Sequence, residues 1–245
     1  MDVSVLVQTC DKYEKYWQGF FYYMDIFWDK KINCPIYFCN QNKKIVTESD
    51  LNIININAGE GTFVENLKFA LEKIKTKYVF YMLEDFWPIR NFEADLFKSL
   101  CEIIEKEKIK SLQVSPITKY YSLEKTSISL DNLNLMKFKK TSEWIFNFQS
   151  RFWDKELLLN SLREPDVSES LVSSAITVED KINKIFDRDV DCYLYQHFWY
   201  PLSGVCYRGE FTGLGKELNN NMLVDLYGKH ISHQSSPSSS HKSVS

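Results

Sequence analysis

The stretch YVFYMLEDFWP, residues 78–88, decides the fold of this chain. Five largely apolar residues, 78–82, lead through Leu83 into two adjacent carboxylates, Glu84 and Asp85. A short apolar run that is bounded by polar residues indicates a buried strand. Carboxylates are costly to place at the edge of a hydrophobic core. Their position directly after the strand therefore suggests that they have a function.

The segments around this stretch alternate between strand and helix patterns. Strand patterns occur at 3–9, 34–41, 51–61 and 111–116, and helix patterns with apolar residues at helical spacing occur at 13–28, 63–75 and 93–108. Thr62 with Glu65 three positions later is the signature of a capping box at a helix start. This order predicts an α/β fold with a mainly parallel central sheet flanked by helices.

The remaining segments have weaker patterns. We expect a surface excursion or short hairpin at 119–142, a link at 163–174, a pair of strands at 190–208 that is broken at 201–204, and a disordered tail at 232–245. Asp154 is the expected N-cap of the helix that starts with KELLLNSL.

Composition and charge restrict the classes of function. The chain has 245 residues and a formal charge of −3, which argues against a nucleic-acid binder. No apolar run reaches the roughly 18 residues that cross a bilayer, and the first residues lack the features of a signal peptide, so we expect a cytosolic protein. Six cysteines without a CxxC pair predict reduced thiols. His230 and His233 have helical ligand spacing but no third ligand, so no zinc site is expected.

Polar side chains follow three of the predicted strands. In α/β sheets, ligands bind beyond the carboxyl ends of the strands. Thr9–Asp11, Asn40–Gln41 and Glu84–Asp85 are therefore expected to line one crevice. Mg²⁺ and Mn²⁺ bind one or two carboxylates together with substrate phosphates, so the Glu84–Asp85 pair is a candidate site for a metal and a nucleotide. The alternative is a pair of solvated charges, and the matching polar strand ends argue against it.

A resemblance to a known family rests on these segments. VSVLVQTCDKY (3–13), IYFCNQ (36–41) and ENLKFALEKIKTKYVFYMLEDFWP (65–88) together resemble the nucleotide-binding half of bacterial GT-A-type glycosyltransferases, the family-2-like enzymes of capsule and lipopolysaccharide biosynthesis. The second half is similar in EWIFNFQSRFWDKELLL (143–159), in the acidic VED (178–180) and in the Arg-Gly pair of CYRGEF (206–211).

The resemblance covers roughly residues 3–212. It implies one GT-A-like domain over 1–231, with a nucleotide-sugar-binding half at 1–115 and a smaller acceptor-side half at 116–231. It also implies a sugar transfer from a nucleotide-diphosphate donor, with UDP the expected nucleotide, to a glycan acceptor. A lipid-linked acceptor and peripheral contact with the inner membrane face are left open, as are the donor sugar and the oligomeric state.

One motif departs from the family pattern. The usual Asp-x-Asp is Leu83-Glu84-Asp85 here, so the first acidic position is lost. The resemblance then implies that Asp85 binds Mn²⁺ or Mg²⁺ and that Glu84 contacts the ribose or a metal-bound water. Metal dependence stays open, because some relatives with changed motifs use basic residues instead.

The resemblance also implies roles for residues outside this motif. An inverting transfer needs a base for the acceptor hydroxyl, and Glu179 or Asp180, at the expected start of a helix, would provide it. The sequence does not separate the two. The further candidates are Thr9, Asp11 and Asn40 for the nucleotide, Arg208 for the diphosphate, and Gln149, Arg151 and Trp153 for the sugar or acceptor, with Trp153 equally suited to the core.

Two other functions remain as alternatives. A non-catalytic carbohydrate-binding module could use the high aromatic content, which is 15%. A sugar-phosphate nucleotidyltransferase would share the α/β layout and a metal, but it needs a glycine-rich phosphate loop after the first strand. QTCDKYEKYW (8–17) contains no glycine.

Overall fold

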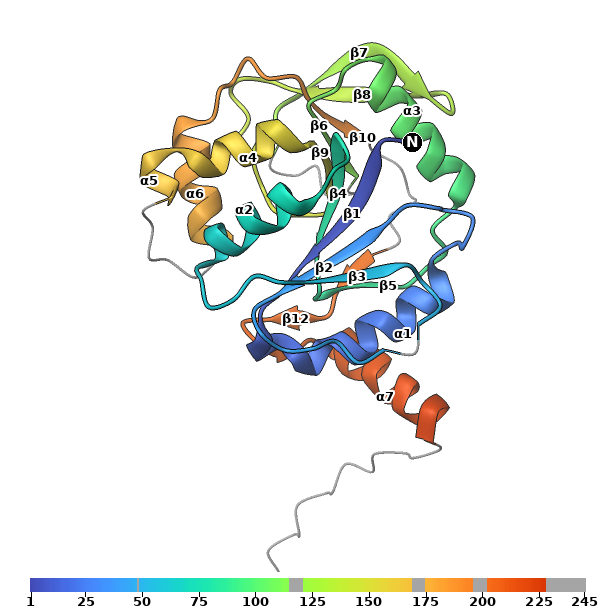
Figure 1. Ribbon diagram of the computed structural model, residues 1–245. Helices are drawn as coiled ribbons and strands as arrows, with labels where there is room; N and C mark the ends of the chain where they lie inside the picture. Colours follow the sequence, from blue (N-terminus) through green and yellow to red (C-terminus); the bar gives the residue numbers. More distant parts are fainter. Residues whose placement is uncertain (48, 115–120, 169–174, 196–201, 228–245) are drawn as a thin grey trace, which may run out of the picture.

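The computed structural model describes residues 1–47, 49–114, 121–168, 175–195 and 202–227. Most of its strands form one nine-stranded sheet with the order β3-β2-β1-β4-β9-β6-β10-β8-β7 (Figure 1). These strands are β1 (Val3–Gln8), β2 (Ile36–Asn40), β3 (Ile53–Asn57), β4 (Tyr78–Leu83), β6 (Ser111–Val114), β7 (Leu123–Leu130), β8 (Leu133–Phe138), β9 (Arg151–Asp154) and β10 (Cys192–Tyr195).

The first four strands of the sheet are parallel, as the strand and helix patterns predict. β1 lies between β2 and β4, and Gln8 at its end is opposite Cys39 and Leu83. The carboxyl ends of these three strands therefore lie at one edge of the sheet. β9 is antiparallel to β4 and β6, and β7 and β8 form the hairpin expected between 119 and 142. The sheet takes strands from both expected halves of the chain.

Helices cover both faces of the sheet (Figure 1). One face carries α1 (Trp17–Phe27), which follows the 3-10 helix η1 (Asp11–Tyr16), together with α3 (Ala94–Lys106) and α7 (Gly213–Tyr227). The other carries α2 (Phe63–Lys73), α4 (Lys155–Arg163), α5 (Pro165–Ser168) and α6 (Ala175–Ile185). A separate hydrophobic cluster fills the space under each group.

Local capping signals fix two helix starts. Thr62 and Glu65 form the predicted capping box at the start of α2. The Asp154 side chain accepts a hydrogen bond of 3.1 Å from the backbone N–H of Leu157 and so caps α4, as expected. Because a helix leaves its first N–H groups without partners, these contacts decide where each helix begins.

The expected strand pair at 190–208 is wrong. β10 is buried along its whole length and lies between β6 and β8 inside the large sheet. β11 (Leu202–Gly204) instead pairs with β5 (Phe86–Pro88), which follows the carboxylate pair. β12 (Cys206–Tyr207) and β13 (Glu210–Phe211) form a separate small hairpin.

Trp87 in β5 anchors the turn that holds the two carboxylates. Its ring is fully buried against α1, and its centroid lies 5.8 Å from that of Phe211 in β13. Gly19 makes room for it, because a Cβ there would lie 1.9 Å from the indole. The turn that carries Glu84 and Asp85 and the β12–β13 hairpin are therefore both positioned by the buried ring of Trp87.

The remaining expectations concern the link at 163–174, the tail at 232–245 and membrane-spanning segments. Residues 165–168 form the short helix α5 instead of a link, with Pro165 at its first position, where proline is favoured. The other part of that link, 169–174, and the tail at 232–245 lie outside the described residues. Among the residues described, no helix is both long enough and apolar enough to span a bilayer.

Candidate functional site

A pocket of about 430 Å³ lies at the carboxyl edge of the parallel strands. This volume falls within the range of small-molecule sites. Its wall combines the ends of β1 and β4, the segment after β2, the beginnings of α2 and α6, and the β12–β13 hairpin. The polar residues Thr9, Gln41, Glu84 and Asp85 meet there, although three different strands deliver them.

The acidic turn places two carboxyl groups of different character on this wall. Burial raises the pKa of Glu84 well above its usual value, and the nearby charge of Asp85 raises it further, whereas the Thr9 hydroxyl opposes the shift. Burial also raises the pKa of Asp85, to about 6. The Oδ1 atom of Asp85 is buried and has no hydrogen-bond partner among the described residues.

The two carboxyl groups fit a metal ion that is shared with a ligand. Within the described part of the chain, no group of three or more His, Cys, Asp or Glu side chains is arranged to hold a metal. Mg²⁺ and Mn²⁺ need only one or two protein carboxylates when phosphates supply the other oxygens. Asp85, with its unpartnered buried oxygen, suits that arrangement and does not form a preformed protein cage.

The β12–β13 hairpin brings Arg208 to the pocket wall. Arg208 and Gly209 both have positive φ, 52° and 82°, which is the signature of a type I′ turn. The conformation is common for glycine and uncommon for arginine. The Gly209 carbonyl of the hairpin accepts hydrogen bonds from the Tyr16 hydroxyl at 2.7 Å and from the Lys15 ammonium at 2.8 Å. Directly before the hairpin, Val205 N–H donates to the Asp85 carbonyl at 2.8 Å.

Asp11 was expected to contact the nucleotide, but it is not part of the pocket wall. Its carboxylate accepts hydrogen bonds from the backbone N–H groups of Gln41, Asn42 and Lys43 at 3.0–3.1 Å. Its own N–H donates to Gln41 Oε1 at 3.2 Å. Both carboxylate oxygens thus hold the segment after β2.

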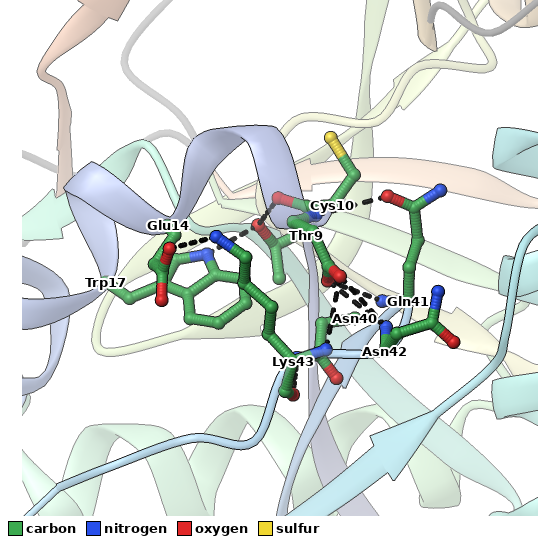
Figure 2. A network of polar contacts seen from close by, with 9 residues as sticks. Thr9, Cys10, Glu14, Trp17, Asn40, Gln41, Asn42 and Lys43 are labelled. Carbon is green, nitrogen blue, oxygen red and sulfur yellow. Dashed lines mark hydrogen bonds and ion pairs between the residues drawn. The ribbon is translucent and has the colours of Figure 1, made fainter.

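Asn40 is likewise placed away from the pocket wall. It is fully buried, its amide nitrogen donates to the Lys43 carbonyl, and its Oδ1 accepts from Asn57. Thr9, in contrast, lies on the wall and accepts a hydrogen bond of 2.8 Å from the indole N–H of Trp17 (Figure 2).

The three candidates for sugar or acceptor contact do not line the pocket. Arg151 and Trp153 of β9 are 0% exposed. β9 is an interior strand between β4 and β6, and Trp153 packs in the hydrophobic cluster under α2, α4 and α6. The Arg151 guanidinium lies 4.5 Å from the centre of the Trp153 ring and donates to the Ile145 carbonyl. Trp153 is therefore a core residue. Gln149 is half-buried and accepts a hydrogen bond from the Gln113 amide.

The two base candidates, Glu179 and Asp180, differ in environment. Both were expected at the start of a helix, but neither lies in the first turn of α6. They occupy its second turn, because α6 already begins at Ala175. Asp180 is exposed, whereas Glu179 is half-buried and accepts a hydrogen bond from Phe148 N–H. Burial raises the pKa of Glu179 to about 7. Ala175, one turn before Glu179 on the same helix face, lines the pocket.

Some residues of the wall did not stand out in the sequence. Lys12 lies there because the chain turns into η1 directly after β1. Gly61, Phe63 and Asn66 lie there because α2 begins at the carboxyl edge. The Gly-flanked turn before Thr62 was a sequence signal for the residues around the start of α2. Lys12 had no comparable signal, because it is a lone lysine after a strand.

Comparisons with known proteins bear on the fold. No protein-family model matches the chain, and no curated protein matches its sequence. The structure of S. aureus TarS 1–349 in complex with UDP-GlcNAc is similar with a TM-score of 0.53 and 14% identity, over 86% of this chain and 60% of that one. UDP-glucose pyrophosphorylase complexed with UDP-glucose is similar with a TM-score of 0.51 and 9% identity, over 80% of this chain and 90% of that one.

These likenesses establish the fold class. The large, mainly parallel sheet flanked by helices is GT-A-like. The chain spans about 60% of the TarS fragment's length. At such low identities the comparison identifies an architecture, and the chemistry has to be argued from the pocket.

Proposed function

We propose that this chain is a glycosyltransferase that moves a sugar from a nucleotide-diphosphate donor, UDP-linked, to a glycan acceptor. The observation that carries the proposal is the charge pattern of the pocket at the strand ends. Asp85 and Glu84 lie on the same wall as two cations, Lys12 and Arg208. The fold adds support, since structures with the same architecture hold UDP-GlcNAc or UDP-glucose.

A bound diphosphate would explain why carboxyl groups and cationic side chains lie on the same wall. Arg208 would bind phosphate oxygens through its planar fork, and Lys12 would contribute a point charge. Asp85 would repel a bare diphosphate, so it is better explained as the ligand of Mn²⁺ or Mg²⁺. When bound, this ion would neutralise the charge of the leaving diphosphate. Glu84, whose pKa is raised by burial, would contact the ribose or a bound water.

Glu179 is the better of the two candidate bases. A general base works best when its pKa lies near the operating pH, and the pKa of Glu179 is raised to about 7. Its carboxylate is held by Phe148 N–H one helical turn below the pocket wall. We propose that it accepts the proton of the acceptor hydroxyl. The acceptor would be a glycan of capsule or lipopolysaccharide type, presented at the inner membrane face when lipid-linked.

The alternatives have less support. A nucleotidyltransferase would share the fold, as UDP-glucose pyrophosphorylase does, but η1 takes the place of a glycine-rich phosphate loop after β1. A carbohydrate-binding module would not need a wall that combines two acids with two cations.

Calorimetry with UDP, with and without Mn²⁺, tests the proposal directly. We expect UDP to bind, Mn²⁺ to strengthen the binding, and UDP-sugars to be hydrolysed slowly without an acceptor. Arg208→Ala should weaken UDP binding, while Lys184→Ala on the outer part of α6 provides a matched loss of charge away from the pocket. Absence of binding for every nucleoside diphosphate would overturn the proposal. Formation of UTP from a UDP-sugar and pyrophosphate would identify a nucleotidyltransferase instead.

A further inference from the structure

We infer that Gln41 reads the base of the bound nucleotide by donating a hydrogen bond from its amide nitrogen to the carbonyl oxygen at ring position 4, and that it thereby selects uracil over cytosine. The inference rests on the proposed function, because it requires a nucleotide in the pocket. It assigns a residue and a contact to the preference for a uracil nucleotide.

The orientation of the Gln41 side chain is fixed by its neighbours. The backbone N–H of Asp11 can only donate, so the amide atom that faces it at 3.2 Å must be the oxygen, Oε1. The Gln41 backbone is held as well, since its N–H donates to Asp11 Oδ1 at 3.1 Å and its carbonyl accepts from Gly59 N–H at 3.0 Å. Among the described residues no hydrogen bond uses Nε2, and Figure 2 shows this nitrogen pointing away from the network.

Gln41 lies at the uncharged end of the pocket. It follows β2, whereas Glu84 and Asp85 follow β4, and β1 lies between these strands. Two strand spacings separate the strand ends by about 10 Å. The pocket residues contributed by the segment before α2 and by α2 itself are Gly61, Phe63 and Asn66, none of which is charged. A nucleoside diphosphate placed along this axis puts its charged phosphates at β4 and its neutral base at β2.

The chemistry of the free amide nitrogen decides which base fits. An amide NH₂ group donates and does not accept. Uracil offers it the carbonyl oxygen O4, whereas cytosine has an amino group at the same position and would place donor against donor. A site that is built to make a hydrogen bond discriminates against a ligand that leaves its polar groups unpaired. The half-buried Phe63 ring offers an apolar surface on which either base could rest.

The test compares the affinities of UDP and CDP, measured by calorimetry on the full chain. The wild type should bind UDP roughly tenfold more tightly than CDP, which is the size expected for one such contact. Gln41→Glu keeps the shape but replaces the donor with an acceptor, so it should reverse the preference or reduce it to near unity. Gln41→Met removes donor and acceptor together, and it should lower UDP affinity and bring the ratio close to one.

Gln18→Glu is the matched control. Gln18 is exposed on α1, and its amide nitrogen donates to the Tyr227 hydroxyl, away from the pocket wall. This variant makes the same chemical change and should keep the wild-type ratio of UDP to CDP affinity. Thermal unfolding of each variant shows whether it folds. If Gln41→Glu does not fold, the test rests on Gln41→Met, which adds no charge beside Asp11.

Two outcomes would overturn the inference while leaving the proposed function intact. The first is equal affinity of the wild type for UDP and CDP. The second is a fall in both affinities by the same factor in the Gln41 variants, which would place the amide against the ribose or a phosphate. If neither nucleotide binds the wild type, the proposed function itself fails, and the inference fails with it.

Discussion

The hydroxyl of Tyr16 donates a hydrogen bond of 2.7 Å to the carbonyl oxygen of Gly209, which lies 193 residues further along the chain. Tyr16 is fully buried, and it ends the 3-10 helix that follows β1. Gly209 is the second central residue of the hairpin turn that carries Arg208. The position of a pocket cation therefore depends on a buried phenol in another part of the fold.

Tyr16→Phe should weaken binding of a diphosphate more than binding of a nucleoside. The ring stays in the core, but the carbonyl of Gly209 loses its buried donor, at a cost of about 1 kcal/mol. The Lys15 ammonium still contacts this carbonyl at 2.8 Å, so the hairpin should loosen without detaching. We expect UDP affinity to fall about fivefold and uridine affinity to stay within twofold in calorimetry.

Tyr22→Phe is the control for this variant. The Tyr22 hydroxyl donates to the Asp225 carboxylate and joins α1 to α7 outside the pocket. It should reduce the stability of the fold without changing UDP affinity. Equal loss of UDP affinity in the two variants would show that the effect comes from general loosening of α1.

Asp85→Asn should stabilise the fold at neutral pH. The pKa of this carboxyl rises from 3.8 to about 6 on folding, so its ionisation opposes folding. The folded state binds more protons than the unfolded state between these values, and stability falls as the pH rises from about 4 to 6. A shift of this size corresponds to roughly 3 kcal/mol, fully expressed above pH 6 and absent below pH 4.

Denaturant unfolding at pH 3.5 and pH 7.5 measures this difference. Asp95→Asn, at an exposed position in the first turn of α3, should show no comparable gain at pH 7.5. A ligand that binds only the folded state raises the unfolding temperature. Mn²⁺ with UDP should therefore raise the unfolding temperature of the wild type and not that of Asp85→Asn. An equal rise in both proteins would remove Asp85 from the metal site.

Glu179→Gln should abolish turnover while leaving donor affinity unchanged. Its pKa of about 7 predicts that kcat of the wild type rises with pH through that value, because the carboxylate form accepts the proton. Asp180→Asn removes a neighbouring exposed carboxylate and should retain turnover. Single-turnover transfer or donor hydrolysis across pH 5.5–8.5 measures both. Normal turnover in Glu179→Gln would place the base elsewhere.

Features that depend on neighbouring residues could be predicted from the sequence. The capping box of Thr62 and Glu65 and the cap at Asp154 arise from interactions within a few residues. The buried strands with polar ends arise from short, largely continuous apolar runs. The meeting of Glu84 with Thr9 in one pocket followed from the general rule for strand ends.

Features that depend on distant partners could not be predicted in this way. The pattern around Arg151 and Trp153 does not show that their strand will lie inside the sheet, between β4 and β6, with helices packed over the face that carries Trp153. β11 pairs with β5, more than 100 residues away, instead of with the nearby β10. The partners of Asp11 are backbone N–H groups about 30 residues later, which no side-chain pattern records.

The partners of Asp11 lead to a last prediction, which separates positioning from contact. Asp11→Ala would leave the N–H groups of Gln41, Asn42 and Lys43 without their acceptor and free the segment after β2 to move. If Asp11 acts by holding Gln41, the ratio of UDP to CDP affinity should fall toward that of Gln41→Met. The double variant, Asp11→Ala with Gln41→Met, should then have the same ratio of UDP to CDP affinity as Gln41→Met alone, because the effects of two residues that act through one contact are not additive.

Asp29→Ala supplies the comparison, since the Asp29 carboxylate also accepts a backbone N–H, that of Lys31, in a turn outside the pocket. It should leave the ratio unchanged. Fully additive losses in the double variant, measured by calorimetry in the four-protein cycle, would mean that Asp11 contacts the nucleotide independently of Gln41. A non-additive cycle together with an unchanged ratio in Asp29→Ala would identify Asp11 as a positioning residue.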